Sequence, residues 1–66
     1  MTTLEEKLIA AARSGHAEIV SMLLSAGTDP DSVNSKGQTA LVLALQENHL
    51  EVARVLQSFI AGRKAP

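Results

Sequence analysis

The amino-acid sequence predicts an all-α fold made of two helical hairpins joined by a polar segment. Three observations support this prediction. Apolar residues recur three or four positions apart in four short runs, which is the spacing of one face of an α-helix. Turn-forming residues crowd the segment Gly27–Gln38 between the second and third runs. Finally, the last two runs repeat the pattern of the first two.

The first helix is expected near residues 3–13. Thr3 and Glu6 have the spacing of a capping box, in which each side chain accepts a hydrogen bond from the other residue's backbone N–H. Gly15 follows the run, and glycine most easily takes the left-handed conformation that ends a helix. The predicted apolar face of this helix consists of Leu4, Leu8, Ile9, Ala11 and Ala12.

A second helix is expected near residues 17–26. Gly27 ends it, and Pro30 opposes its continuation because the residue before a proline is pushed out of the α region. The predicted buried stripe of this helix consists of Ile19, Val20, Leu23 and Leu24. The first half of the chain is therefore predicted to be a helical hairpin.

The polar segment contains two turn sequences, Asp29–Asp31 and Ser35–Gly37. Gly37 can adopt a positive φ without steric cost. Thr39, at the end of the segment, is expected to cap the third helix with its hydroxyl group.

The third and fourth helices are expected near residues 40–47 and 50–61, with Asn48 between them. The apolar positions of the fourth helix are Val52, Ala53, Val55, Leu56 and Phe59. The second half is thus predicted to be another helical hairpin.

The two halves form an internal repeat with a period of 33 residues, as from Leu8 to Leu41. Gly15 aligns with Asn48, and these are two residue types that tolerate the left-handed conformation. Further identities in this register are Ala11 with Ala44, His16 with His49, Glu18 with Glu51, Leu23 with Leu56, and Ser25 with Ser58.

A period of this length, made of two helices and a polar turn, is typical of ankyrin repeats. The stretches "LIAAARSGHAEIVSMLLSAGTDP" and "GQTALVLALQENHLEVARVLQSFIAG" resemble the family pattern from Leu8 to Ala61. Ala40 and Val42 depart from it, since the family usually has Pro and His there. The resemblance implies an ankyrin-repeat solenoid in which the polar segment is a β-hairpin-like finger.

The expected organisation is one domain, residues 1–66, with a first repeat at about 3–33, a second at about 34–62 and a tail at 63–66. Both ends depart from the repeat pattern. Met1–Lys7 lacks the usual start, and Gln57 aligns with Leu24, so we expect a minimal array with modified ends. The predicted core consists of Leu8, Ile9, Ala11, Val20, Leu23, Leu41, Ala44, Val52 and Leu56.

Composition argues against several classes of function. The chain has no cysteine, two histidines and a formal net charge of −1, which disfavours disulfides, zinc sites and nucleic-acid binding. With one Phe and no Trp or Tyr, it lacks aromatic platforms for bases. Its apolar runs are too short to span a membrane. We expect a cytoplasmic protein, with the nucleus as a second possibility, that uses neither a cofactor nor a membrane.

Catalytic and metal-binding roles are not expected. His16 and His49 open equivalent helices, where the family uses histidine structurally, and no further His or Cys completes a ligand set. Acidic residues in turns and at helix ends have no nucleophile at a recognisable spacing; these are Asp29, Asp31, Glu47 and Glu51. We therefore predict that the chain is not an enzyme and holds no metal.

The resemblance implies binding of a partner protein through the finger and the concave face of the inner helices. The residues that it places there are Arg13, Ser14, Asp31, Ser32, Asn34, Ser35, Lys36, Gln38, Val42, Gln46 and Glu47. The alternative for each is ordinary solvated surface. Val42 is expected to pack inward, although an exposed Val42 would offer a small apolar anchor. Arg63 and Lys64 in the tail are candidates for contact with an acidic partner.

Two alternative functions remain open. The stretch "LIAAARSGHAEIVSMLL" followed by "NSKGQ" is similar to the start of the ankyrin-repeat inhibitors of cyclin-dependent kinases, which implies regulation of an enzyme. Self-association is the other alternative, because about three stacked repeats are usually needed to bury enough surface. A homo-oligomer would supply the missing burial.

Overall fold

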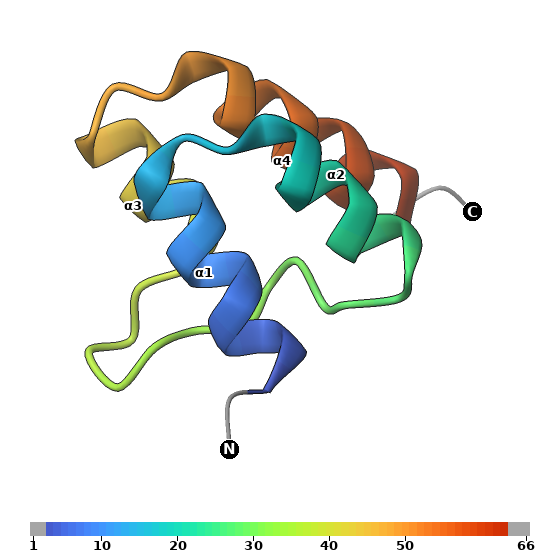
Figure 1. The fold of residues 1–66 in the computed structure, drawn as a ribbon, viewed down its shortest axis with the longest axis horizontal. Coiled ribbons are helices and arrows are strands. Elements are labelled where there is room, and N and C mark those ends of the chain that lie inside the picture. The colour runs from blue at the N-terminus through green and yellow to red at the C-terminus, as the bar shows by residue number, and fades with distance from the viewer. Residues whose placement is uncertain (1–2, 64–66) are drawn as a thin grey trace.

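The computed structural model describes residues 3–63, with the side chain of Arg63 excepted. Its four helices are α1 (Leu4–Ser14), α2 (Ala17–Ser25), α3 (Ala40–Gln46) and α4 (Leu50–Arg63), shown in Figure 1. Within residues 3–63, extended pairing is limited to one isolated antiparallel bridge between Val33 and Thr39. The all-α prediction is confirmed, and the predicted helices end within two residues of the observed ones.

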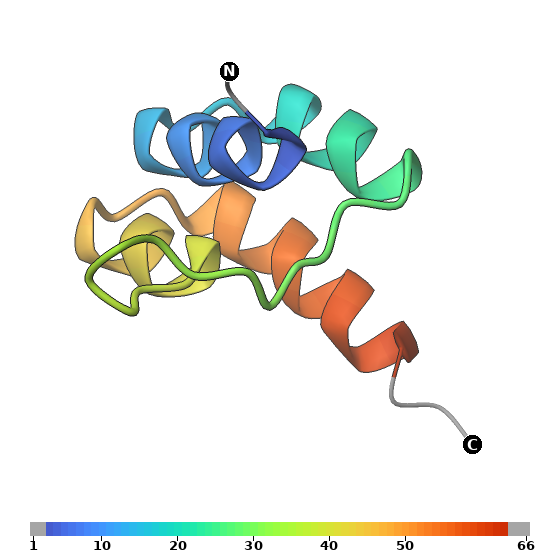
Figure 2. The same cartoon turned by 90° about the horizontal axis from the view of Figure 1, so that it is seen from below.

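The two hairpins form two layers. Helices α1 and α2 make the upper layer in Figure 2, and α3 and α4 make the lower one. Between the layers, α1 packs on α3 and α2 packs on α4, while each helix also contacts its partner within the hairpin. This arrangement is that of a helical-repeat solenoid, with the polar segment crossing from one layer to the next.

The predicted caps are present at the helix ends. The Thr3 hydroxyl accepts a hydrogen bond from the Glu6 N–H at 3.2 Å, and the Glu6 carboxylate accepts one from the Thr3 N–H at 3.0 Å. Gly15 and Asn48 both have left-handed backbones, with φ of 83° and 63°. The turn inside each hairpin therefore uses the same conformation, as the alignment of these residues predicted.

One apolar core joins both layers. Its buried members are Leu8, Ile9, Ala11, Ala12, Val20, Leu24, Ala40, Leu43, Ala44, Val52, Ala53 and Leu56. Most of the predicted core is confirmed, but Leu23 and Leu41 are only half-buried at its margin. The short helix α3 turns Ala40, Leu43 and Ala44 inward, so Leu41 lies on its flank.

The predicted buried stripe of α2 was too wide, because Ile19 is exposed. Leu4, which was predicted only to share the apolar face of α1, is exposed as well. Helical spacing shows which residues share a face, but it does not show whether a neighbouring helix covers the whole face. In this fold only one side of the first hairpin meets the second hairpin (Figure 2).

Candidate interaction surface

The finger, residues Gly27–Gln38, is shaped by local hydrogen bonds made by its own polar side chains. At its base, the Asp29 carboxylate accepts a hydrogen bond from the Asp31 N–H at 2.9 Å. The Ser32 hydroxyl donates to the Asp29 carbonyl at 2.7 Å. These are the contacts by which Asp and Ser favour turns over helices and strands.

Asn34 organises the tip of the finger. Its side-chain oxygen accepts from the N–H groups of Lys36 and Gln38 at 2.9 and 3.0 Å. Its side-chain amide donates to the Gln38 side-chain oxygen at 3.1 Å. Gly37 completes the turn with a φ of 76°, as predicted. Asn34 and Gln38, two predicted contact residues, thus hold the shape of the tip.

Thr39 ties the finger to α3. Its hydroxyl accepts a hydrogen bond from the Val42 N–H at 3.2 Å, which confirms the predicted N-cap. The same residue forms the isolated bridge with Val33. A finger fixed to a helix at its base presents its other residues at a defined place beside α1.

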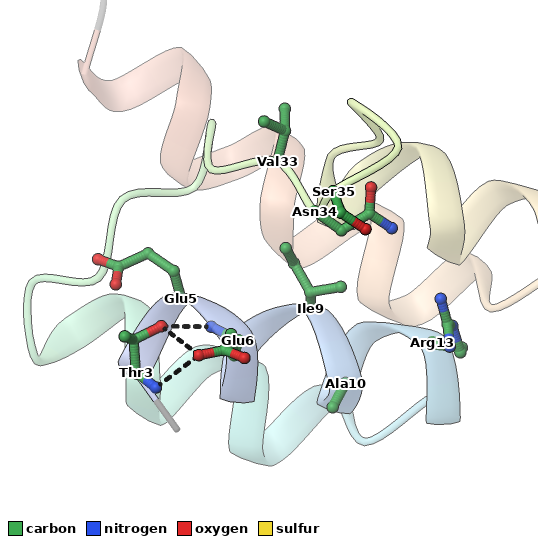
Figure 3. A pocket seen from close by; sticks show the side chains of 9 residues that line it. All are labelled: Thr3, Glu5, Glu6, Ile9, Ala10, Arg13, Val33, Asn34 and Ser35. Carbon is green, nitrogen blue, oxygen red and sulfur yellow. Dashed lines mark hydrogen bonds between the residues drawn. The ribbon is translucent and has the colours of Figure 1, made fainter. Parts of the chain in front are cut away.

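An open groove of about 490 Å³ lies between α1 and the finger. The residues that line it are Thr3, Glu5, Glu6, Ile9, Ala10, Arg13, Val33, Asn34 and Ser35. In Figure 3, Ile9 points from α1 toward the finger; Val33 and Ser35 contribute to the lining from the finger, with the Val33 side chain directed away from α1. The groove therefore has one helical wall and one loop wall.

The groove is chemically polarised along α1. Glu5 lies near one end and Arg13 near the other, with Ile9 between them (Figure 3). The two charged residues are eight positions apart in the sequence, which is about 12 Å along a helix axis. Glu6 also lines the acidic end, but its carboxylate is engaged with Thr3 in the capping box. An acidic end, an apolar middle and a basic end follow one another.

The predicted surface residues are divided between the groove and other parts of the surface. Arg13, Asn34 and Ser35 line the groove. Those outside it are Ser14 at the end of α1, Asp31, Ser32, Lys36 and Gln38 on the finger, and Val42, Gln46 and Glu47 on or just after α3. Lys64 in the predicted basic tail lies outside the described residues.

The expectation that Val42 packs inward is wrong, because its side chain is 40% exposed. The equivalent residue, Ile9, is buried against the second hairpin. Val42 lies in the second hairpin, and its side of α3 faces away from the first one. The same position is thus buried in one repeat and exposed in the other.

Six of the groove residues were not predicted from the sequence as contact residues; these are Thr3, Glu5, Glu6, Ile9, Ala10 and Val33. A signal was present, because Glu5, Ile9 and Arg13 are four residues apart and therefore share one side of α1. What the spacing alone does not show is that this side faces the finger.

A second cavity, of about 410 Å³, lies where the finger leaves α2 and passes α4. Its lining consists of Leu24, Gly27, Thr28, Asp29, Pro30 and Phe59. The Thr28 side chain is 4% exposed, and its hydroxyl has no hydrogen-bond partner among the described residues. This cavity is mostly apolar, with one unsatisfied hydroxyl group in its wall.

The two histidines have different surroundings. The ring of His49 packs against Gly15 of the first hairpin, and His16 is exposed without capping α2 by its side chain. Within residues 3–63, no three His, Asp or Glu side chains are grouped as metal ligands would be. In the same part of the chain, no helix has both the length and the apolar character needed to cross a membrane.

Comparison with known families gives a match to the model described as "Ankyrin repeats (3 copies)" over residues 5–63. Among curated proteins, a probable E3 ubiquitin-protein ligase of Oryza sativa subsp. japonica is 49% identical over 52 residues, covering 79% of this chain and 10% of the ligase. The NAD-capped RNA hydrolase of Homo sapiens is 42% identical over 57 residues, covering 86% of this chain and 12% of the hydrolase.

Cyclin-dependent kinase inhibitor 2A of Monodelphis domestica is 36% identical over 61 residues, covering 92% of this chain and 35% of the inhibitor. No solved structure gives a significant match. The chain thus spans about a tenth of the ligase and of the hydrolase, and about a third of the kinase inhibitor.

Proposed function

The chain belongs to the ankyrin-repeat family, and we propose that it binds a partner protein in the groove between α1 and the finger. Ankyrin repeats generally mediate protein–protein interaction and are typically non-catalytic. The ligase and the hydrolase are named for enzymatic activities, but only a tenth or so of each matches this chain. We accordingly assign a binding function, and no reaction, to these 66 residues.

The observation that supports this site is the ordered chemistry of the groove. In its apolar middle, the exposed Val33 beside the buried Ile9 offers contact area for one apolar side chain of a partner. Glu5 is half-buried beside it and would attract a basic side chain, while Arg13 at the far end would attract an acidic one. We infer that the partner contributes an extended segment with a basic, an apolar and an acidic residue in that order along α1.

The remaining predicted contact residues form a second part of the proposal. Lys36 projects from the finger tip, and Val42 and Gln46 lie one helical turn apart on α3. Together with Glu47, they would extend the contact beyond the groove. We also propose that both repeats act as one domain, because the core is continuous between the two layers.

A pair of double variants tests the groove. Arg13→Glu with Val33→Ser changes the groove, whereas Lys36→Glu with Gln46→Arg changes the surface beside it. Proteins captured from lysate by the wild-type chain are identified first, and their affinities for both variants are then measured. We expect the groove variant to bind at least about tenfold more weakly, a difference of about 1.4 kcal/mol.

Both variants must keep the wild-type helical circular dichroism, because all four positions are exposed. An equal loss of affinity in both double variants would mean that the binding site also includes the finger tip and α3. Unchanged affinity of the groove variant, with a loss confined to the other variant, would reject the groove as the binding site.

Regulation of a protein kinase is the second candidate function. It is favoured by the similarity to the Monodelphis domestica kinase inhibitor, which covers 92% of this chain. Purified chain should then bind a cyclin-dependent kinase and reduce its activity in a dose-dependent way. Absence of binding, with the same kinase bound by the opossum inhibitor in parallel, would remove this candidate.

A further inference from the structure

Some positions of the repeat are exposed in the first hairpin and buried in the second, whereas others are buried in the first and exposed in the second. Ile19 on α2 is 46% exposed, whereas its equivalent Val52 on α4 is 0% exposed. Leu45 on α3 is 49% exposed, whereas its equivalent Ala12 on α1 is 0% exposed. Each hairpin therefore has one side against the other hairpin and one side that is open (Figure 2).

These differences define two open faces. The leading face is the open side of the first hairpin, and the trailing face is the open side of the second. Residues of the leading face are Lys7, Ala10, Ile19, Met22 and Leu23, whose equivalents Ala40, Leu43, Val52, Val55 and Leu56 are all more buried. Residues of the trailing face are Leu41, Val42, Leu45 and Gln57, whose equivalents Leu8, Ile9, Ala12 and Leu24 are buried.

We propose that the trailing face of one copy binds the leading face of a second copy, head to tail. The chain already contains one contact of this kind, in which α1 meets α3 and α2 meets α4. A second copy placed by the same displacement would repeat that contact between chains. Seven of the nine residues on the two faces are apolar, so most of the repeated contact removes apolar surface from water.

Side-chain size supports the fit. Where α1 packs on α3, the buried core residues include the small Ala12 on α1 and the large Leu43 on α3. In the contact between copies, the corresponding positions hold the large Leu45 and the small Ala10. Each contact therefore contains one leucine and one alanine, with the large and the small residue on opposite sides in the two contacts. The total side-chain volume is the same, and substitutions that conserve volume are the ones that packing tolerates best.

Two polar residues make the contact between copies weaker than the internal one. Lys7 takes the place of the buried Ala40, and Gln57 takes the place of the buried Leu24. The aliphatic stem of Lys7 can lie on the α3 side chains while its ammonium group stays in water. Association should therefore be reversible and dependent on concentration. Because the two contacting faces differ, it should also continue beyond a dimer.

Complementation between two variants tests this proposal. Met22→Glu places a charge on the leading face, and Leu45→Glu places one on the trailing face. Sedimentation of the wild-type chain should show an average mass that rises with concentration, whereas each variant alone should remain monomeric. An equimolar mixture of the variants should regain association but stop at a dimer, since each variant keeps one intact face.

Ser58→Glu is the matched control, because this position is exposed in both hairpins and so lies on neither face. It should associate like the wild type. Regained association in the mixture also shows that both variants are folded, and circular dichroism checks each one separately. A wild-type chain that stays monomeric up to about 1 mM would overturn the proposal. Association of Met22→Glu alone would also overturn it, in favour of a symmetric contact between trailing faces.

Discussion

The ring of His49 in the second hairpin occupies the space that a side chain at Gly15 in the first hairpin would need. A Cβ atom placed on Gly15 would lie 2.6 Å from Nδ1, 2.8 Å from Cε1 and 3.0 Å from Cγ of His49. Gly15 also has a φ of 83°, which side chains other than glycine rarely adopt. One glycine thus ends α1 and also allows the two layers to approach each other.

Gly15→Ala should destabilise the fold through both effects. The left-handed backbone costs about 1–2 kcal/mol with a Cβ atom, and the overlap with the His49 ring adds about 1–3 kcal/mol. Gly37→Ala is the control, because Gly37 has a φ of 76° and open space around it. Thermal unfolding should show a larger loss of stability for Gly15→Ala than for Gly37→Ala. Adding His49→Ala to Gly15→Ala should recover only the part of that loss caused by the overlap with the ring, and not the part caused by the left-handed backbone. Equal losses for both glycine variants would show that the ring contact is unimportant.

Thr28→Val should stabilise the protein. The buried Thr28 hydroxyl has no hydrogen-bond partner among the described residues, and leaving such a group unsatisfied costs about 1–3 kcal/mol. Valine keeps the shape and removes the polar atom. The same substitution at Thr39 should act in the opposite direction, by about 0.5–2 kcal/mol, because it removes the N-cap of α3. Urea denaturation of the two variants measures both effects, and a destabilised Thr28→Val would reveal a partner for the hydroxyl.

Leu43→Ala should cost more than Leu41→Ala, although the two residues lie in the same short helix. Leu43 is buried and Leu41 is half-buried. Truncating a buried leucine costs about 2–5 kcal/mol, and a domain of this size has little stability to lose. One kcal/mol corresponds to about 4–8 °C in Tm at this length. The Tm values of both variants test this order, and a larger decrease in Tm for Leu41→Ala would show that α3 is rotated so that Leu41 is the more buried residue.

Asn34→Leu should loosen the tip of the finger without unfolding the helices. The substitution removes the acceptor of the Lys36 and Gln38 N–H groups. Hydrogen exchange at these two amides should become about tenfold faster if 1.4 kcal/mol of protection is lost. Asn34→Asp keeps the acceptor oxygen and should change the exchange less, and Ser35→Ala should leave it unchanged. Unaltered exchange in Asn34→Leu would mean that Asn34 is available for a partner instead.

The sequence by itself determined the features that depend on local backbone chemistry. Capping by Thr3 and Thr39 and the left-handed backbones at Gly15, Gly37 and Asn48 were all predicted correctly. These outcomes follow from side chains within four residues of each other and from steric limits on φ. The repeat in turn identified the family, because a period of two helices and a turn is visible without knowledge of any contact.

Only the tertiary structure decided which apolar residues are covered and where the groove lies. Ile19 and Val52 look alike in sequence, yet only Val52 has a helix packed over it. Likewise, the role of Glu5 and Arg13 depends on the finger folding back beside α1, which brings residues some 20 to 30 positions apart into one groove. Burial and grooves arise from surfaces that meet only after stacking. A local pattern specifies each surface, but not which surface lies against it.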